Sequence, residues 1–522
     1  MNLSRRQAIQ LGAAVAGGVA AAVGTATFAG AAAPQQAVRG SSGEGPVVAR
    51  TRLGALRGSR KDNVTTWKGI RFAEPPTGRY RFAPPRPVTR PWTGVQDATE
   101  FAAMPLQLKS PLADGNSGPQ DEDCLFLNVW SRSTRGRKPV IVWMTGGGFR
   151  AGAGSNFDGT AYAQQHDVVL VTINYRVNAF GYLYQPDRPG SGNCGLLDQI
   201  EALRWVRDNI TAFGGDPRKV TVMGQSAGGM SIGILLGTPA ARGLFHRAII
   251  QSGGARPTVM QQGKDATTHA TLRALGLGQD QADRLIDVPA KDLLAATAEV
   301  NKGTEIRSEP FHPLIDNVVL HTHPLNLIPA DVDLLIGTCD RDYLPDPTWQ
   351  SEMEFVIRYA AGDKGFDRLL QIYTESTSTG RDPRMDLLGS AFVQMPSIWL
   401  AEHAHRVGAR VWQYTFDYAD ASSAGATHTS STPFIFGTPT PGRLAQGADS
   451  ASAQRLADGM VASFSSFART GNPAIRALPR WPAFTPGNRA TMSFDATPRL
   501  KNDRLPAERR HAWDGIDPLK AC

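Results

Sequence analysis

Ser226 lies in a Gly-Gln-Ser-Ala-Gly pentapeptide at 224–228, where an apolar run meets a stretch of small residues. The apolar run 220–223 is typical of a buried strand, and the stretch 228–236 is typical of a packed helix. A serine at such a strand-to-helix turn has strained backbone dihedrals that leave its hydroxyl exposed, and the flanking glycines make room for the turn. The sequence therefore predicts that Ser226 is a nucleophile.

The same Gly-x-Ser-x-Gly pattern occurs a second time at 229–233, around Ser231. Ser231 falls inside the expected helix, where a serine hydroxyl usually bonds to a neighbouring carbonyl. Ser226 falls at the strand-to-helix junction itself, so the context favours Ser226. A serine with only a structural role in the turn is the alternative interpretation.

A serine hydroxyl is a weak nucleophile near neutral pH, so a base must take its proton and a further group must orient that base. If the chain order is serine, acid and histidine, the candidate bases are His403, His405, His428 and His511. The first two lie in an expected helix and the last in a charged tail. His428 lies in a loop, so we expect it to be the base, with a mere surface histidine as the alternative.

The acid is expected after the buried strand 332–337, because active sites of α/β proteins form at the carboxyl ends of their strands. Asp340 and Asp342 both follow this strand, on either side of Arg341. Spacing does not choose between the two carboxylates, and either could instead pair with Arg341.

An oxyanion hole is indicated by three glycines, 146–148, directly after the strand that ends at Thr145. Glycines let backbone N–H groups approach a substrate oxygen without obstruction, and Ala227 would add the N–H that follows the nucleophile. A plain glycine turn is the alternative.

The elements that must position these residues indicate an α/β fold. Buried strands are expected at 139–145 and 168–175, and an amphipathic helix at 198–213 leads into the strand before Ser226, which makes a crossover suited to a parallel sheet. Further strands are expected at 248–251, 332–337 and 411–416. The helix-rich regions 260–310 and 350–400 are expected to be insertions that shape a substrate pocket.

The N-terminal segment is similar to a twin-arginine export signal. Arg5 and Arg6 precede a long uncharged stretch rich in Ala and Gly, and the small residues 29–31 offer a cleavage site before Ala32. We therefore expect a signal peptide at 1–31, a linker at 32–46 and one catalytic domain at 47–522, in an exported protein. An uncleaved membrane anchor is the alternative for the first segment.

Composition excludes several other classes of protein. The 522 residues are 41% hydrophobic and 20% charged, which is ordinary for a globular protein. The net charge of +8 is spread along the chain without a dense basic block, so nucleic-acid binding is not expected. The four cysteines, which lack the spacing of zinc or redox motifs, are expected to be free thiols: Cys124, Cys194, Cys339 and Cys522.

Several longer motifs make residues 47–513 resemble the type-B carboxylesterases, a family of α/β-hydrolases that also contains the cholinesterases. The motifs are GIRFAEPP at 69–76, EDCLFLNV at 122–129, GLLDQ at 195–199, the pentapeptide around the serine, and RGLFHRAI at 242–249. The resemblance implies the α/β-hydrolase fold, with a large, mostly parallel central sheet flanked by helices. It also implies hydrolysis of carboxylic esters without a metal or cofactor.

Carried over by position, the resemblance implies a triad of Ser226, His428 and Asp342. It also assigns the oxyanion hole to Gly147, Gly148 and Ala227. Finally, it implies that Arg81 and Glu122 form a structural ion pair.

This sequence departs from the family pattern at four positions. The acid is Asp342 where the family usually has Glu, Thr145 replaces a His or Tyr, and Gln225 replaces a Glu before the nucleophile. Met104 stands where Cys124 would usually find its disulfide partner. The stretch 102–125 contains no aromatic residue, which disfavours choline esters, because aromatic faces bind quaternary ammonium groups.

The expected protein is an exported serine carboxylesterase that acts on small, neutral or weakly polar esters through an acyl-enzyme. A lipase or an amidase of the same fold is the nearer alternative. A non-catalytic binding protein on this fold is the more distant alternative.

Overall fold

The computed structural model describes residues 46–108, 118–255, 264–302, 310–344, 347–419, 425–439 and 450–521. The expected signal peptide 1–31 and almost all of the expected linker 32–46 lie outside the described residues. Residues 44–522 form one unit by their internal contacts, and the fold below is that of this unit.

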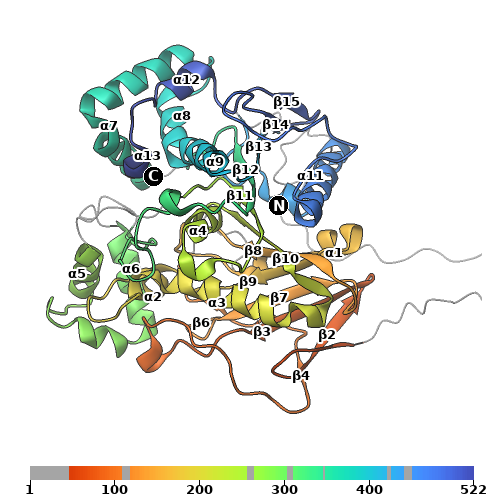
Figure 1. Ribbon diagram of the computed structural model, residues 1–522. Helices are drawn as coiled ribbons and strands as arrows, with labels where there is room; N and C mark the ends of the chain where they lie inside the picture. The colour runs from red at the N-terminus through yellow and green to blue at the C-terminus, as the bar shows by residue number, and fades with distance from the viewer. Residues whose placement is uncertain are drawn as a thin grey trace, which may run out of the picture. The chain divides into compact units, whose positions relative to one another are not determined.

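A thirteen-stranded sheet runs through this unit (Figure 1). Its central strands β9-β8-β10-β11-β12-β13-β14 are parallel, and antiparallel strands extend the sheet at both edges. The strands are β1 Val47–Arg50, β2 Ala55–Lys61, β3 Val64–Arg71, β4 Val95–Asp97, β7 Phe126–Ser131, β8 Lys138–Met144, β9 Val169–Ile173, β10 Gly215–Gln225, β11 Arg247–Gln251, β12 Asp333–Cys339, β13 Val411–Phe416, β14 Thr491–Phe494 and β15 Arg499–Lys501. Two short strands, β5 Met104–Pro105 and β6 Gln120–Asp121, pair separately.

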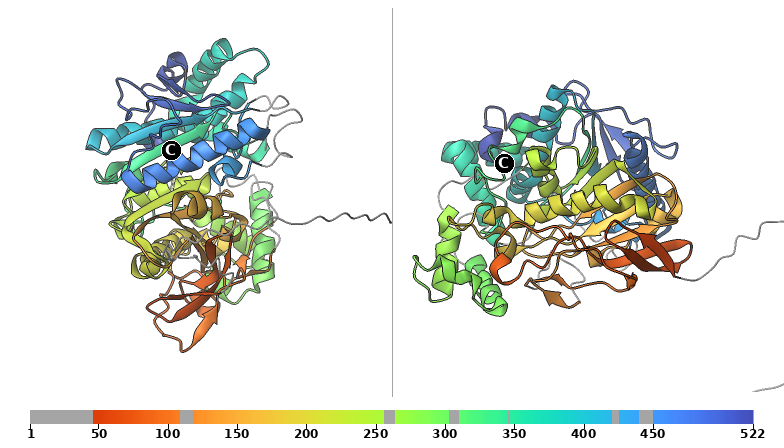
Figure 2. Two further views of the ribbon diagram at one scale, coloured as in Figure 1. Left: turned by 90° about the vertical axis from the view of Figure 1, so that its right-hand side faces the viewer. Right: turned by 60° about the horizontal axis from the view of Figure 1, so that its bottom comes forward.

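Helices cover both faces of the sheet, as the turned views show (Figure 2). Helices α3, α4 and α9 pack in one hydrophobic cluster, and α1 and α11 pack in a second cluster. The α-helices are α1 Thr160–His166, α2 Asn178–Tyr182, α3 Cys194–Asn209, α4 Ala227–Leu236, α5 Lys264–Ala274, α6 Ala290–Lys302, α7 Pro347–Ser376, α8 Pro383–Gly389, α9 Met395–Val407, α10 Thr432–Ile435, α11 Ser450–Thr470, α12 Ala507–His511 and α13 Pro518–Ala521.

The apolar runs form strands because both of their faces are buried. In β8, Val140, Val142 and Met144 enter the cluster with α3 and α4, whereas Ile141 and Trp143 enter the cluster with α1 and α11. Side chains alternate between the faces of a strand, so a strand covered by helices on both sides must be apolar at every position. The predicted α/β-hydrolase class, with a large, mostly parallel sheet, is confirmed.

The predicted elements match the central strands closely. The helix expected at 198–213 is α3 followed by a 3₁₀ turn, Ile210–Phe213, and the strand before the serine extends over all of β10. Strands β1 to β4 were not predicted, because many of their residues are partly buried or exposed and the strands show no long apolar run. Of these, β1, β2 and β3 pair antiparallel, and β4 pairs parallel with β2.

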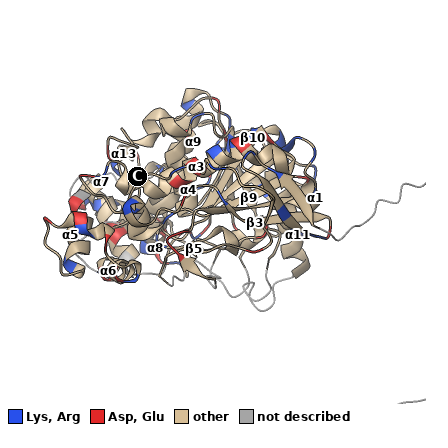
Figure 3. Cartoon of the chain, turned by 90° about the horizontal axis from the view of Figure 1, so that it is seen from below, with Lys and Arg blue, Asp and Glu red and all other residues tan. Residues whose placement is uncertain are grey.

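Charged residues of both signs are interspersed over the elements in Figure 3. Among the described residues, no helix is long and apolar enough to cross a membrane. Cys124, Cys194 and Cys339 are buried free thiols, which confirms the expectation for these three, and Cys522 lies outside the described residues.

His323 is buried at the start of a short 3₁₀ helix, Pro324–Leu327, where its Nδ1 accepts the Leu325 N–H at 3.3 Å. Burial lowers the pKa of this imidazole to about 4, and the nearby His403 contributes in the same direction. A histidine that folding keeps neutral makes the fold sensitive to acid.

We expect the free energy of unfolding to fall as the pH drops from about 6.5 to 4. In this range His323 binds a proton in the unfolded chain but stays neutral in the folded chain. The contribution of His323 is intact above pH 6.5, and its loss at pH 4 is on the order of 2 to 3 kcal/mol. In His323→Asn the amide oxygen can still accept the Leu325 N–H, so urea titrations across this range should show a shallower decline. Identical slopes for both proteins would contradict this role.

Candidate active site

Ser226 forms a sharp turn between β10, which ends at Gln225, and α4, which begins at Ala227. Its φ of +55° and ψ of −126° are strained for a residue with a side chain. The neighbouring glycines are required by close packing, because a Cβ on Gly228 would lie 2.0 Å from the carbonyl oxygen of Met144. The strand-to-helix turn expected at Ser226 is therefore present in the structure.

Ser231 lies inside α4 and is fully buried. Its Oγ accepts a hydrogen bond from the side-chain amide of Gln199 at 3.0 Å, so its partner is a side chain of α3 and not the helix carbonyl that we expected. The structure thus separates the two serines, because Ser231 faces a packed helix and Ser226 faces the carboxyl edge of the sheet.

His428 lies between the other two predicted site residues, in the loop that joins β13 to α10. Its Nε2 is 2.8 Å from the Ser226 Oγ, and its Nδ1 is 2.6 Å from the Asp342 Oδ1. A neutral imidazole that donates from Nδ1 to the carboxylate can accept the serine O–H at Nε2. The three side chains, from positions far apart in the chain, form one continuous hydrogen-bonded row.

The other candidate histidines lie elsewhere. His403 is in α9 with its Nδ1 2.8 Å from the carbonyl oxygen of Trp399, and His405 lies in the same helix. His511 is an exposed residue of α12.

The two candidate carboxylates point in different directions. Asp342 is 1% exposed and contacts His428, whereas Asp340 forms an ion pair of 3.0 Å with Arg381. Neither carboxylate pairs with Arg341, in contrast to the alternative that the sequence left open. Of the two, Asp342 alone has the geometry to orient His428.

Two further donors hold the Asp342 carboxylate. Its Oδ2 accepts the Ser252 O–H at 2.7 Å and the Cys339 N–H at 2.8 Å. These bonds position a carboxylate that is one methylene shorter than the usual Glu of the family. Sequence reasoning missed Ser252, although its place directly after the strand 247–251, before two glycines, puts it at the same edge of the sheet.

Apart from Asp342, the groups that contact His428 are neutral. The Gln225 side-chain amide donates to the carbonyl oxygen of His428 at 2.9 Å, and the Phe392 ring lies 5.2 Å from the imidazole ring. Burial raises the pKa of the Cys339 thiol, and the Asp342 carboxylate contributes to this increase. Cys339 is therefore a neutral thiol and not a competing nucleophile.

Backbone N–H groups gather beside Ser226. Gly147 and Gly148 have φ of +117° and +61°, and a Cβ on Gly147 would lie 2.2 Å from the carbonyl oxygen of Ala151. Within the described residues, no acceptor receives the N–H of Gly147, Gly148 or Ala227. These three donors remain available for a substrate oxygen, as an oxyanion hole requires.

Thr145, which replaces an aromatic family residue, is buried before this loop. The Tyr175 hydroxyl donates to the Thr145 carbonyl oxygen at 2.7 Å and so supports the end of the loop. No three His, Cys, Asp or Glu side chains of the described segments are arranged to hold a metal ion.

The ion pair that the family pattern implied is also present. Arg81 and Glu122 are 2.5 Å apart, and Arg81 Nη1 also donates to three carbonyl oxygens of the segment 285–288. This arginine therefore ties the helical insertion around α6 to the body of the fold and has no place in the site.

Comparison with known proteins identifies the family of the chain. The model of the carboxylesterase family matches residues 45–513. The para-nitrobenzyl esterase of Bacillus subtilis (strain 168) is 36% identical over an alignment of 480 residues that covers 87% of this chain and 96% of that protein. The phenmedipham hydrolase of Pseudarthrobacter oxydans is 33% identical over 84% of this chain and 92% of its own length.

Solved structures give the same result. A PNB esterase superposes with a TM-score of 0.80 at 33% identity, covering 89% of this chain and 99% of its own. A carboxylesterase of Geobacillus stearothermophilus superposes with a TM-score of 0.80 at 34% identity, covering 90% and 100%. The chain therefore belongs to the carboxylesterase family of α/β-hydrolases and is a serine hydrolase of carboxylic esters.

Proposed function

We propose that this carboxylesterase works through an acyl-enzyme on Ser226, with His428 as general base and Asp342 as the acid that orients it. The observation that carries the proposal is the row of two short contacts, 2.8 Å and 2.6 Å, that joins the three side chains. Small neutral or weakly polar esters are the proposed substrates, because the neutral Gln225 beside Ser226 offers no charge to a cationic group.

In the first half of the reaction, His428 takes the hydroxyl proton while the Ser226 oxygen attacks the ester carbonyl carbon. The carbonyl oxygen becomes an oxyanion that receives the N–H groups of Gly147, Gly148 and Ala227. His428 then gives its proton to the departing alcohol, which leaves an acyl-serine.

In the second half, water replaces the alcohol. His428 takes a proton from the water as it attacks the acyl carbon, and the proton returns to the Ser226 oxygen when the carboxylic acid leaves. Asp342 remains ionised throughout and stabilises the imidazolium that forms twice in each cycle.

Replacing the nucleophile should abolish turnover while leaving the fold intact. We expect Ser226→Ala to lower kcat for p-nitrophenyl butyrate roughly 10³-fold or more, because no other hydroxyl of the described residues contacts His428 Nε2. Ser231→Ala is the matched control, with near-normal kcat and a stability cost of about 1 to 2 kcal/mol from the unpaired Gln199 amide. Retained turnover in Ser226→Ala would refute the nucleophile.

Substitutions of the two candidate aspartates should have equally different effects on kcat. We expect Asp342→Asn to lower kcat roughly 10³- to 10⁴-fold, because an amide no longer selects the Nδ1–H tautomer of His428. Asp340→Asn should stay within about threefold of the wild type, since Arg381 keeps its second carboxylate partner, Asp386. If steady-state kinetics show that the Asp340 change alone is crippling, the assignment of the acid is wrong.

We further propose that the protein is exported by the twin-arginine route and cleaved before Ala32. The support is the Arg5-Arg6 pair before an uncharged stretch with small residues at 29–31. Changing Arg5 and Arg6 together to Lys should leave the esterase activity inside the producing cells, as measured by cell fractionation. An unchanged distribution of activity, or an exported chain that does not begin at Ala32 by mass spectrometry, would contradict this route.

A further inference from the structure

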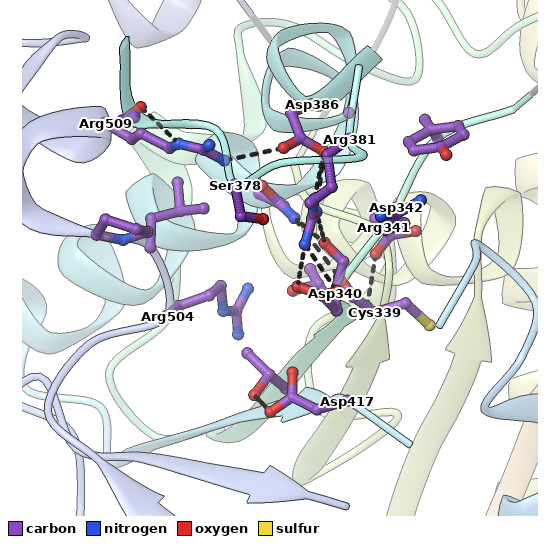
Figure 4. Close-up of a pocket in the computed structure, with 18 of the residues that line it drawn as sticks. Cys339, Asp340, Arg341, Asp342, Ser378, Arg381, Asp386, Asp417, Arg504 and Arg509 are labelled. Carbon is purple, nitrogen blue, oxygen red and sulfur yellow. Dashed lines mark hydrogen bonds and ion pairs between the residues drawn. The ribbon is translucent and has the colours of Figure 1, made fainter. Parts of the chain in front are cut away.

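A cavity of about 280 Å³ lies behind the proposed triad acid (Figure 4). Asp342 and its neighbours after β12 form one wall, and residues of the C-terminal segment 501–509 form another. The cavity is separate from the oxyanion loop, because neither Ser226 nor the glycines 146–148 contribute to its lining.

Most charged side chains on these walls have a partner of opposite charge. Asp386 is shared by Arg381 at 2.9 Å and Arg509 at 3.1 Å. The other pairs are Arg381 with Asp340 at 3.0 Å and Lys501 with Asp417 at 2.5 Å. These charges are balanced locally, so each contributes little to the field at the triad.

Arg504 is the exception among the buried cations of the cavity. The residue is 8% exposed, and its Nη2 donates to the carbonyl oxygens of Ile336 at 2.8 Å and Tyr414 at 3.3 Å. Its Nε and Nη1 have no acceptor, and no carboxylate of the described residues lies within ion-pair distance. Burial lowers the pKa of Arg504 to about 10, so the group is still a cation at neutral pH.

Among the carboxylates of the cavity, Asp342 is the one without a permanently charged partner. Its three partners are the Ser252 hydroxyl, the Cys339 N–H and His428, whose imidazole must be neutral before the reaction begins. A buried carboxylate with only neutral donors is costly, and a nearby cation offsets part of that cost. Arg504 and Asp342 are thus a buried cation and a buried carboxylate at the same cavity, and neither has an ion-pair partner among the permanently charged groups of the described residues.

We propose that Arg504 is a positioning residue of the esterase, whose buried cation disfavours protonation of the Asp342–His428 pair, so that Asp342 stays ionised and His428 stays neutral and ready to accept the serine proton. The guanidinium reaches the cavity wall from the C-terminal segment, between Ser378 and Asp417 in Figure 4. It acts through its field and not by contact, because the carboxylate oxygens are already occupied by other donors. The inference rests on the triad proposed above.

Other ionisable groups share this region. Arg341 also lines the cavity, but it is only half-buried, so water screens its charge. Asp503, beside Arg504 in the chain, is neutralised by Arg489 and Arg510, each at 2.8 Å. The remaining ionisable groups that line the cavity or lie near Arg504 or Asp342 are Cys339, Asp340, Tyr343, Arg381, Asp386, Tyr414, Asp417, Lys501 and Arg509.

The test is the pH profile of kcat/KM in Arg504→Gln, which keeps a polar side chain at this position but carries no charge. Without the cation, protonation of the Asp342–His428 pair becomes easier. The midpoint of the acidic limb should therefore move up by about 0.5 to 1 pH unit, with KM on the plateau unchanged. Arg504→Lys should return the midpoint most of the way to the wild-type value.

Arg410→Gln is the control. Arg410 is a surface arginine directly before the first residue of β13, at the end of this strand that lies away from the cavity, and it pairs with Asp333 at 2.6 Å. Its profile should match the wild type. A folded Arg504→Gln protein with an unmoved acidic limb overturns the proposal. If that variant does not fold, Gln394→Glu, which adds a negative charge at a buried position on the cavity wall with almost no change in size, must shift the limb upward, and an unmoved limb there is equally decisive.

These results are distinguishable from failure of the proposed triad. If the proposed triad is wrong, the Ser226→Ala and Asp342→Asn proteins will keep their turnover. A triad that is right, with an unshifted Arg504→Gln profile, removes only the role assigned to Arg504.

Discussion

The site depends on one constrained turn, in which β10 becomes α4 within a single residue. Ser226 takes a positive φ there, and the turn fits only because Gly224 and Gly228 have no side chain where the backbones of β8 and α4 meet. The register of β8 with β10 places Met144 beside Gly224. That pairing brings the glycine loop after β8 next to the serine, so one packing contact sets the positions of both Ser226 and the glycine loop.

Parallel pairing explains why the remaining groups converge. Four parts of the site follow the carboxyl ends of strands that are neighbours in the sheet. The glycine loop follows β8, Ser226 follows β10, Ser252 follows β11 and Asp342 follows β12. His428 arrives from the loop after the next strand, β13. Parallel strands all end at one edge, so residues as far apart in the chain as Gly147 and His428 meet there without any long-range signal in the sequence.

The shorter acid is accommodated by its surroundings. Ser252 and the Cys339 N–H fix one carboxylate oxygen of Asp342, which leaves the other aimed at His428. Such tight enclosure removes water from a charged group, and the balance of charge must then come from the protein. Two features of the cavity behind Asp342 contribute to this balance of charge. They are the ion pairs in its walls and the guanidinium of Arg504, which has no ion-pair partner among the described residues.

By itself, the sequence determined the α/β class, the preference for Ser226 over Ser231, and the choice of His428, because strand runs, helix periodicity and turn residues are local patterns. Resemblance to the family added Asp342 and the two oxyanion glycines. Only the tertiary structure decided that Asp340 pairs with Arg381 while Asp342 faces His428. It alone showed Ser252 and Arg504, because their roles follow from distances across neighbouring strands, which no local pattern of residues encodes.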